Sequence, residues 1–140
     1  MVGKEYPPHE YEVGREKIRE YARAVGETNP IHTDPEAARA AGFSNVVAPP
    51  MFAVVYSAMA MAPAILDPEL GINLALMVHG GQEFEWSKPV VAGDVITTQA
   101  RVKDIYDKNG MKFYVFESES KNQEGDTVVK GTWTDIVRAG

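Results

Sequence analysis

The polar side chains best suited to chemistry gather in one short segment, residues 26–34. It places the carboxylate of Glu27 five residues before the imidazole of His32, with Asn29 between them. Histidine suits a general base because its ordinary pKa, about 6.5, lies nearest to neutral pH. His32 is therefore the candidate base, Glu27 a partner acid that orients it or donates a proton, and Asn29 a residue that fixes the loop through its own backbone. A histidine before a helix is more often a surface or capping residue, so the spacing alone leaves both interpretations open.

Helices are predicted on both sides of this loop. In residues 15–25, Ile18, Tyr21, Ala22 and Val25 recur at helical spacing, which predicts an amphipathic surface helix. Asp34 and the proline after it are typical of a helix start, so a short alanine-rich helix should follow and end at Gly42. The loop that carries His32 is thus expected to be held at both ends.

A third helix and four strands complete the prediction. Residues 50–62 are apolar on every side, which predicts a helix buried nearly all round. The later segments are rich in β-branched and aromatic residues and are separated by turn residues, which predicts four antiparallel strands in a meander: residues 82–89, 95–106, 111–122 and 127–137. The expected fold is α+β, a single hot-dog domain over residues 1–140 in which an antiparallel sheet wraps around a long buried helix. A sandwich with added helices is the alternative.

Composition narrows the class of function. The net charge is −6 and no run of basic residues could follow a phosphate backbone, so no nucleic-acid partner is expected. The chain has no cysteine, which excludes disulfides, a thiolate nucleophile and a cysteine-ligated metal. Residues 1–12 lack the apolar core of a signal peptide, and prolines interrupt the most apolar stretch, so we expect a cytoplasmic protein without a membrane span. No metal cluster or dinucleotide motif is present, and no cofactor is expected.

Four segments, in this order, resemble the MaoC-like and (R)-specific enoyl-CoA hydratase family. The loop at residues 26–32 resembles the family motif Asp-x-Asn-Pro-x-His, with Glu27 in place of the aspartate. The others are APPMF at residues 48–52, VHGGQEF at 78–84 and KPVVAGD at 88–94. The resemblance covers most of the chain from about Tyr6 onward. The opening, with YPP at residues 6–8 and YEVGREKIREY at 11–21, is similar to actinobacterial proteins described as MaoC dehydratase N-terminal domains.

The resemblance implies hydration of trans-2-enoyl thioesters to 3-hydroxyacyl thioesters, or the reverse dehydration, on coenzyme A or acyl carrier protein. It implies that His32 and Glu27 together hold the water. A glutamate moves the carboxylate by about an ångström relative to an aspartate, and a displacement of that size can cost about a hundredfold in rate. The expected substrate-binding residues are Asn29, Pro50, Met51, His79, Gly80 and Gly81, with backbone amides at the start of the central helix holding the thioester carbonyl. For His79, a structural role at the end of a strand is the alternative.

Two alternatives remain. The actinobacterial subgroup includes accessory subunits of dehydratase heterodimers, which implies a non-catalytic acyl-binding subunit, although His32 favours catalysis. A hot-dog thioesterase needs an acid near the central helix, and residues 50–66 contain no Asp or Glu. The family joins two hot-dog domains side by side, so a homodimer or a heterodimer with a second hot-dog subunit is expected.

Several other side chains are predicted to be structural. Asp94 is expected to form a turn after Gly93. Tyr56, Met59 and Met61 are expected to be core residues, with lining of an acyl tunnel as the alternative. Trp86 and Trp133 are expected to fill the packed face of the sheet.

Overall fold

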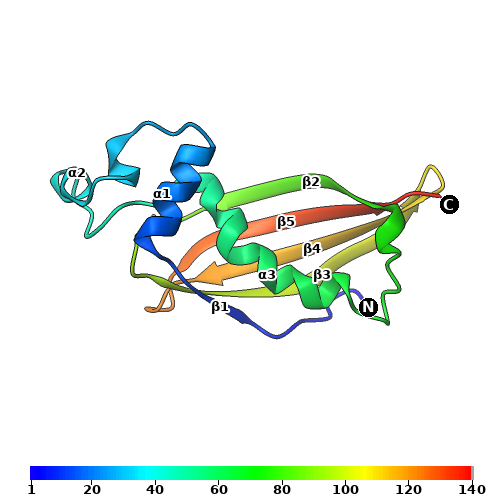
Figure 1. The fold of residues 1–140 in the computed structure, drawn as a ribbon. Helices are drawn as coiled ribbons and strands as arrows, with labels where there is room; N and C mark the ends of the chain where they lie inside the picture. The colour runs from blue at the N-terminus through cyan, green and yellow to red at the C-terminus, as the bar shows by residue number, and fades with distance from the viewer. Residues whose placement is uncertain (140) are drawn as a thin grey trace.

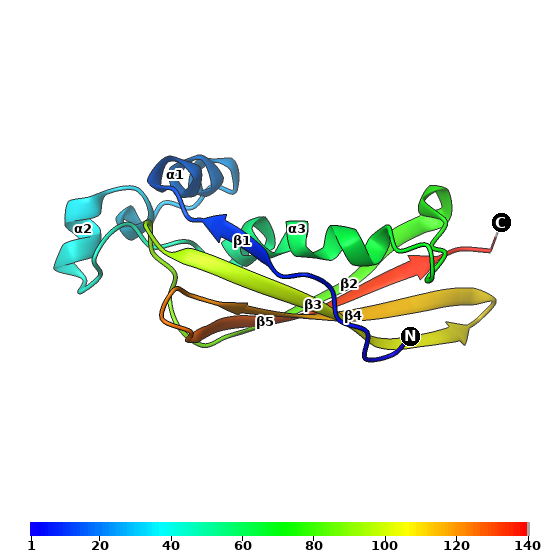
Figure 2. The same cartoon turned by 90° about the horizontal axis from the view of Figure 1, so that it is seen from below.

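The computed structural model describes residues 1–139. Its helices and strands, in chain order, are β1 (His9–Glu12), α1 (Arg15–Ala24), α2 (Pro35–Ala40), α3 (Ala53–Ile65), β2 (Met77–Trp86), β3 (Val95–Lys108), β4 (Met111–Lys121) and β5 (Thr127–Val137). Short 3-10 turns, η1 (Pro30–His32), η2 (Pro50–Phe52) and η3 (Leu74–Leu76), precede α2, α3 and β2. Figure 1 shows α3 lying across the sheet, and Figure 2 shows α1 and α3 on the same side of it.

The strands form one antiparallel sheet in the order β1-β3-β4-β5-β2. Strands β3, β4 and β5 form the predicted meander, but β2 pairs with the far side of β5, so the prediction of four consecutive neighbours was wrong for the first strand. The segment between β2 and β3 instead crosses the end of the sheet, where Val91 bridges Val47. The hot-dog prediction of a sheet curved around one central helix is confirmed.

The helix starts and turns follow the sequence closely. Asp34 caps α2 by accepting a hydrogen bond from the Glu36 N–H at 3.0 Å, as predicted. Asp94 closes the turn before β3 by accepting from the Val91 N–H at 3.0 Å. Strand β1 was not predicted: its residues pair with β3, and that distant pairing outweighs the prolines and charges around it.

Helix α3 is less buried than its composition indicates. Its inner face packs on β3, β1 and β4, with Phe52, Ala53, Tyr56 and Ala60 in the core. Its outer face leaves Met51, Met59 and Leu66 exposed. The prediction of a helix buried nearly all round was therefore wrong for a single chain, because one sheet covers only one face of the helix.

Candidate active site

His32 is held in the wall of a cavity by the main chain. Its side chain is buried, and Nδ1 lies 2.6 Å from the carbonyl oxygen of Val47. A carbonyl can only accept, so Nδ1 carries the proton and Nε2 is the nitrogen that can act on a ligand. The Val47 N–H in turn donates to the Ile31 carbonyl at 2.9 Å. The two segments therefore fix both the position and the tautomer of the ring.

The cavity has a volume of about 400 Å³ and a largely apolar wall. Loop residues, the start of the central helix and the end of β2 all contribute to it: Ile31, His32, Phe43, Val47, Ala48, Pro49, Pro50, Tyr56, Trp86, Ser87, Lys88, Pro89 and Val90. Such a wall suits an acyl chain, and His32 is the only titratable ring nitrogen in it. A cavity of this kind places the imidazole of His32 beside an apolar acyl chain.

Tyr56 and Trp86 contribute more to the cavity than their predicted structural roles. Tyr56 belongs to both interpretations, since it is buried in the core and also lines the cavity, and burial raises the pKa of its phenol so that it stays protonated. Trp86 was wrongly predicted to fill the packed face: it is half exposed, and its Nε1–H donates to the Pro50 carbonyl at 2.8 Å. Trp133 does fill that face. Trp86 is the last residue of β2 and adjoins a loop, and this position is the signal that could have indicated its exposure.

The remaining loop residues order the backbone around His32. Asn29 accepts a hydrogen bond from the Ile31 N–H at 3.2 Å and begins the turn that carries His32, as expected for a loop asparagine. Glu27 is exposed, accepts from the Asn29 N–H at 3.3 Å, and does not line the cavity. Glu27 and His32 thus share one ordered loop, although the carboxylate lies outside the cavity wall.

The other predicted binding residues divide into two groups. Pro50 lines the cavity, whereas the side chain of Met51 next to it is exposed. His79, Gly80 and Gly81 lie at the start of β2, seven to five residues before Trp86. At about 3.3 Å per residue this is roughly 17–23 Å along the strand. Within one chain the structure does not bring them to the cavity.

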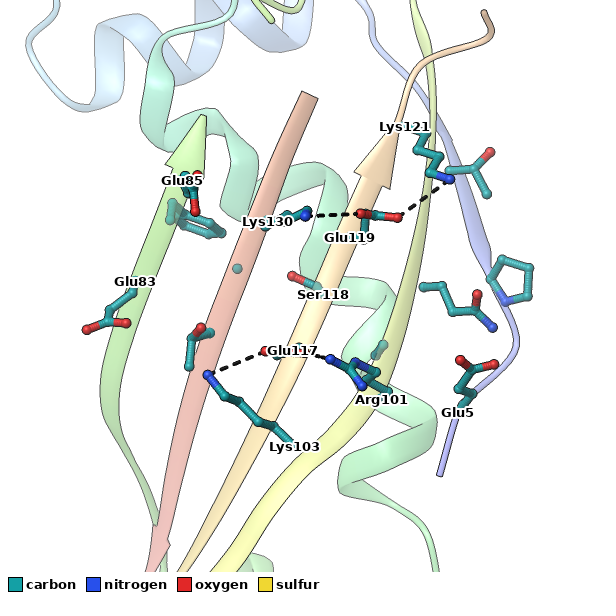
Figure 3. Close-up of a pocket in the computed structure, with 17 residues that line it drawn as sticks. Glu5, Glu83, Glu85, Arg101, Lys103, Glu117, Ser118, Glu119, Lys121 and Lys130 are labelled. Carbon is teal, nitrogen blue, oxygen red and sulfur yellow. Dashed lines mark hydrogen bonds and ion pairs between the residues drawn. The ribbon is translucent and has the colours of Figure 1, made fainter. Parts of the chain in front are cut away.

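A second, larger hollow of about 1030 Å³ lies on the sheet face opposite α3, and Figure 3 shows its charged lining. Ion pairs occupy it: Glu119 lies 3.5 Å from Lys121 of the same strand and 3.8 Å from Lys130 of the next, and Glu117 pairs with Arg101 and Lys103 of β3. Because its cations are paired and it contains no histidine, we assign it to the solvated face of the sheet.

Two features are absent from the described residues, 1–139. No group of three or more His, Cys, Asp or Glu side chains in this range could hold a metal ion. Over the same residues, no helix combines the length and the apolar character that crossing a bilayer requires.

Comparison with known proteins agrees with this geometry. Residues 1–131 match the family model for the FAS1-like dehydratase domain region. A UPF0336 protein of Saccharopolyspora erythraea is 45% identical over 139 residues, which are 99% of this chain and 89% of that protein. The fold and the cavity define a hot-dog domain of the dehydratase and hydratase class. The chain belongs to the FAS1-like dehydratase family, together with the UPF0336 proteins.

Two solved structures extend the comparison. A MaoC-like dehydratase matches 99% of this chain at a TM-score of 0.88 and 30% identity, and the chain spans 42% of that longer protein. The HadBC (3R-hydroxyacyl-ACP dehydratase) complex of Mycobacterium tuberculosis contains a chain that matches at a TM-score of 0.79 and 29% identity, over 96% of both chains. The predicted resemblance to MaoC-like proteins is confirmed.

Proposed function

We propose that this protein hydrates trans-2-enoyl thioesters to 3-hydroxyacyl thioesters, or catalyses the reverse dehydration, in the cavity of His32. The observation that carries the proposal is the 2.6 Å contact between His32 Nδ1 and the Val47 carbonyl, which leaves Nε2 as a base in an apolar cavity. In hydration, Nε2 takes a proton from water while the water oxygen bonds to the β-carbon, and the electron pair of the double bond takes up a proton at the α-carbon. Dehydration runs through the same contacts in reverse.

Glu27 and the start of the central helix complete the proposed site. Glu27 is the partner acid and holds the water together with His32, from the loop that Asn29 orders. The first amides of a helix lack intrahelical acceptors and carry partial positive charge, so those at Pro50–Phe52 suit the negative charge that develops on the thioester oxygen. Pro50 has no N–H, and the Phe52 N–H donates to the Pro49 carbonyl at 2.8 Å, which leaves this role to the Met51 N–H. The acyl group is carried on coenzyme A or acyl carrier protein, and no other cofactor takes part.

The test is hydration of crotonyl-CoA and of a longer trans-2-enoyl-CoA, followed by the loss of enoyl absorbance. We expect activity in the purified protein and a loss of about 10²–10⁴-fold in His32→Ala, the usual contribution of a general base. His9→Ala is the matched control, because His9 lies on β1 and does not line the cavity. Equal activity in His32→Ala and the parent protein would refute the assignment.

A second candidate function is an acyl-binding subunit that works beside a catalytic hot-dog partner. Two observations favour it: the carboxylate of Glu27 lies outside the cavity wall, and the similar HadBC structure is a complex of subunits. This candidate predicts a protein that binds acyl thioesters but does not hydrate them alone. Activity that appears only after a second hot-dog subunit is added would establish it.

A further inference from the structure

A second acid–base pair lies at the far end of β2. Nδ1 of His79 is 3.0 Å from Oδ1 of Asp135, a residue that is 3% exposed on β5. The ring also meets Trp133 edge-on, with the centroids 6.0 Å apart, while about half of the His79 side chain stays exposed. A buried carboxylate that accepts a hydrogen bond from Nδ1 orients an imidazole and stabilises the imidazolium that forms during proton transfer. Nε2 of the oriented ring then points outward, where it can transfer a proton.

A bulge turns His79 toward this carboxylate. His79 pairs with Asp135 and Gly81 pairs with Thr134, so Gly80 is an extra residue in β2. In a regular strand, alternation would place His79 on the outer face with Glu83 and Glu85. A Cβ on Gly80 would lie 2.3 Å from Cδ1 of Ile136, so any larger residue here would have to displace the Ile136 side chain. Bulges commonly re-aim side chains near functional sites.

The outer edge of β2 is open in the described chain. The strand ends the sheet beyond β5, and Figure 1 shows no described strand on its outer side. Its side chains Val78 and Trp86 are exposed, as are Met59 and Leu66 on the outer face of α3. The unpaired N–H and C=O groups of an open strand edge, with exposed apolar side chains beside them, form a surface that pairs with another strand. The similar HadBC structure is likewise a complex of subunits.

A second copy of this chain fits that edge with two-fold symmetry. Antiparallel pairing of β2 with its own copy sets the start of each strand against the end of the other. Full overlap places Met77 beside the partner's Trp86 and His79 beside the partner's Phe84. His79 then lies two residues, about 7 Å along the strand, from the partner's Trp86. Because Trp86 lines the cavity of His32, full overlap places each His79 beside the rim of the other chain's cavity.

We propose that His79, oriented by Asp135, is the second proton-transfer group of the site and is supplied across a two-fold β2–β2 interface. The inference rests on the proposed hydratase function. As His32 takes a proton from water and the oxygen bonds to the β-carbon, the electron pair of the double bond forms a Cα–H bond with the Nε2 proton of the partner's His79. Proton exchange with solvent then returns a proton to His79 and removes one from His32.

Mixing two inactive variants tests the exchange of residues between chains. His32→Ala and His79→Asn are each expected to lose about 10²–10⁴-fold in kcat/KM as intact dimers. In a mixed dimer one site carries both substitutions and the other carries neither. Random mixing in equal amounts should therefore restore about a quarter of the parent activity. No recovery from mixing, or full activity in His79→Asn, would overturn the proposal.

Cross-linking tests the pairing without an activity assay. The chain has no cysteine, so introduced thiols are the only ones present. Full overlap places Val78 beside the partner's Glu85, so a mixture of Val78→Cys and Glu85→Cys chains should form a disulfide-linked dimer. His9→Cys mixed with Glu85→Cys is the control, because His9 lies on the opposite sheet edge, and it should not cross-link. A protein that forms the cross-link but has no hydratase activity would refute the hydratase function and leave the β2 pairing standing. An active, His32-dependent protein without the cross-link would refute the β2 pairing alone.

Discussion

Exchanging the carboxylate of Glu27 tests whether it acts on water or only shapes the loop. Glu27→Gln keeps an oxygen for the Asn29 N–H, at 3.3 Å in the parent, and removes only the charge. Because the side chain is exposed, the free energy of unfolding should change by less than about 0.5 kcal/mol. If the carboxylate holds the water, kcat/KM for crotonyl-CoA hydration should fall by about 10²-fold or more.

Glu27→Asp supplies the opposite change. It shortens the side chain by one carbon–carbon bond, about 1.5 Å. An aspartate accepts readily from the N–H two residues ahead, so the turn to Asn29 is kept. Misplacement by about an ångström can cost about a hundredfold, so restoring the family's aspartate should raise kcat/KM by about ten- to a hundredfold. The assay is the initial loss of enoyl absorbance, with stability measured by urea unfolding. If both variants stay within twofold of the parent while His32→Ala is inactive, Glu27 is only a turn residue.

Three further expectations follow from the packing. Phe52→Ala should lower the free energy of unfolding by about 3–5 kcal/mol, because the ring is fully buried and meets Tyr21 edge-on at 5.4 Å; urea unfolding that shifts by less than 1 kcal/mol would contradict this. Hydrogen bonds from Lys4 and Tyr6 lower the pKa of Asp67 to about 2. The stabilisation that the ionised carboxylate gives the fold is therefore present above about pH 4 and is lost as the pH falls through about 2. Acid unfolding of Asp67→Asn should lack that step. Met59→Lys places a charge on the exposed face of α3 and, if that face is covered in a dimer, should shift light-scattering mass toward the monomer.

Local signals in the sequence predicted most of the elements. The cap at Asp34 and the turn at Asp94 depend on contacts within a few residues, and the structure confirms both. Strand β5 has the predicted bounds, residues 127–137. The position of β2 beside β5 depends on pairing across about fifty residues, which no local pattern encodes.

Only part of the candidate site was predicted, because its other contacts also join residues that lie far apart in the sequence. The loop of Asn29 and His32 is a local motif, and the structure places it at a cavity as an ordered turn. The partner of the His32 ring is the main-chain carbonyl of Val47, and a carbonyl leaves no trace in residue identity. The contact between His79 and Asp135 joins residues 56 positions apart, on strands that only the fold brings together.

The contact between His32 and Val47 has a consequence for how the protein can change over evolutionary time. The acceptor is a backbone oxygen that every amino acid possesses, so a substitution at position 47 changes the shape of the cavity but keeps the tautomer of the base. Mutation can therefore adapt this wall to acyl chains of different size without altering the catalytic nitrogen. A substitution at position 47 can thus change the range of substrates without changing the proton transfer.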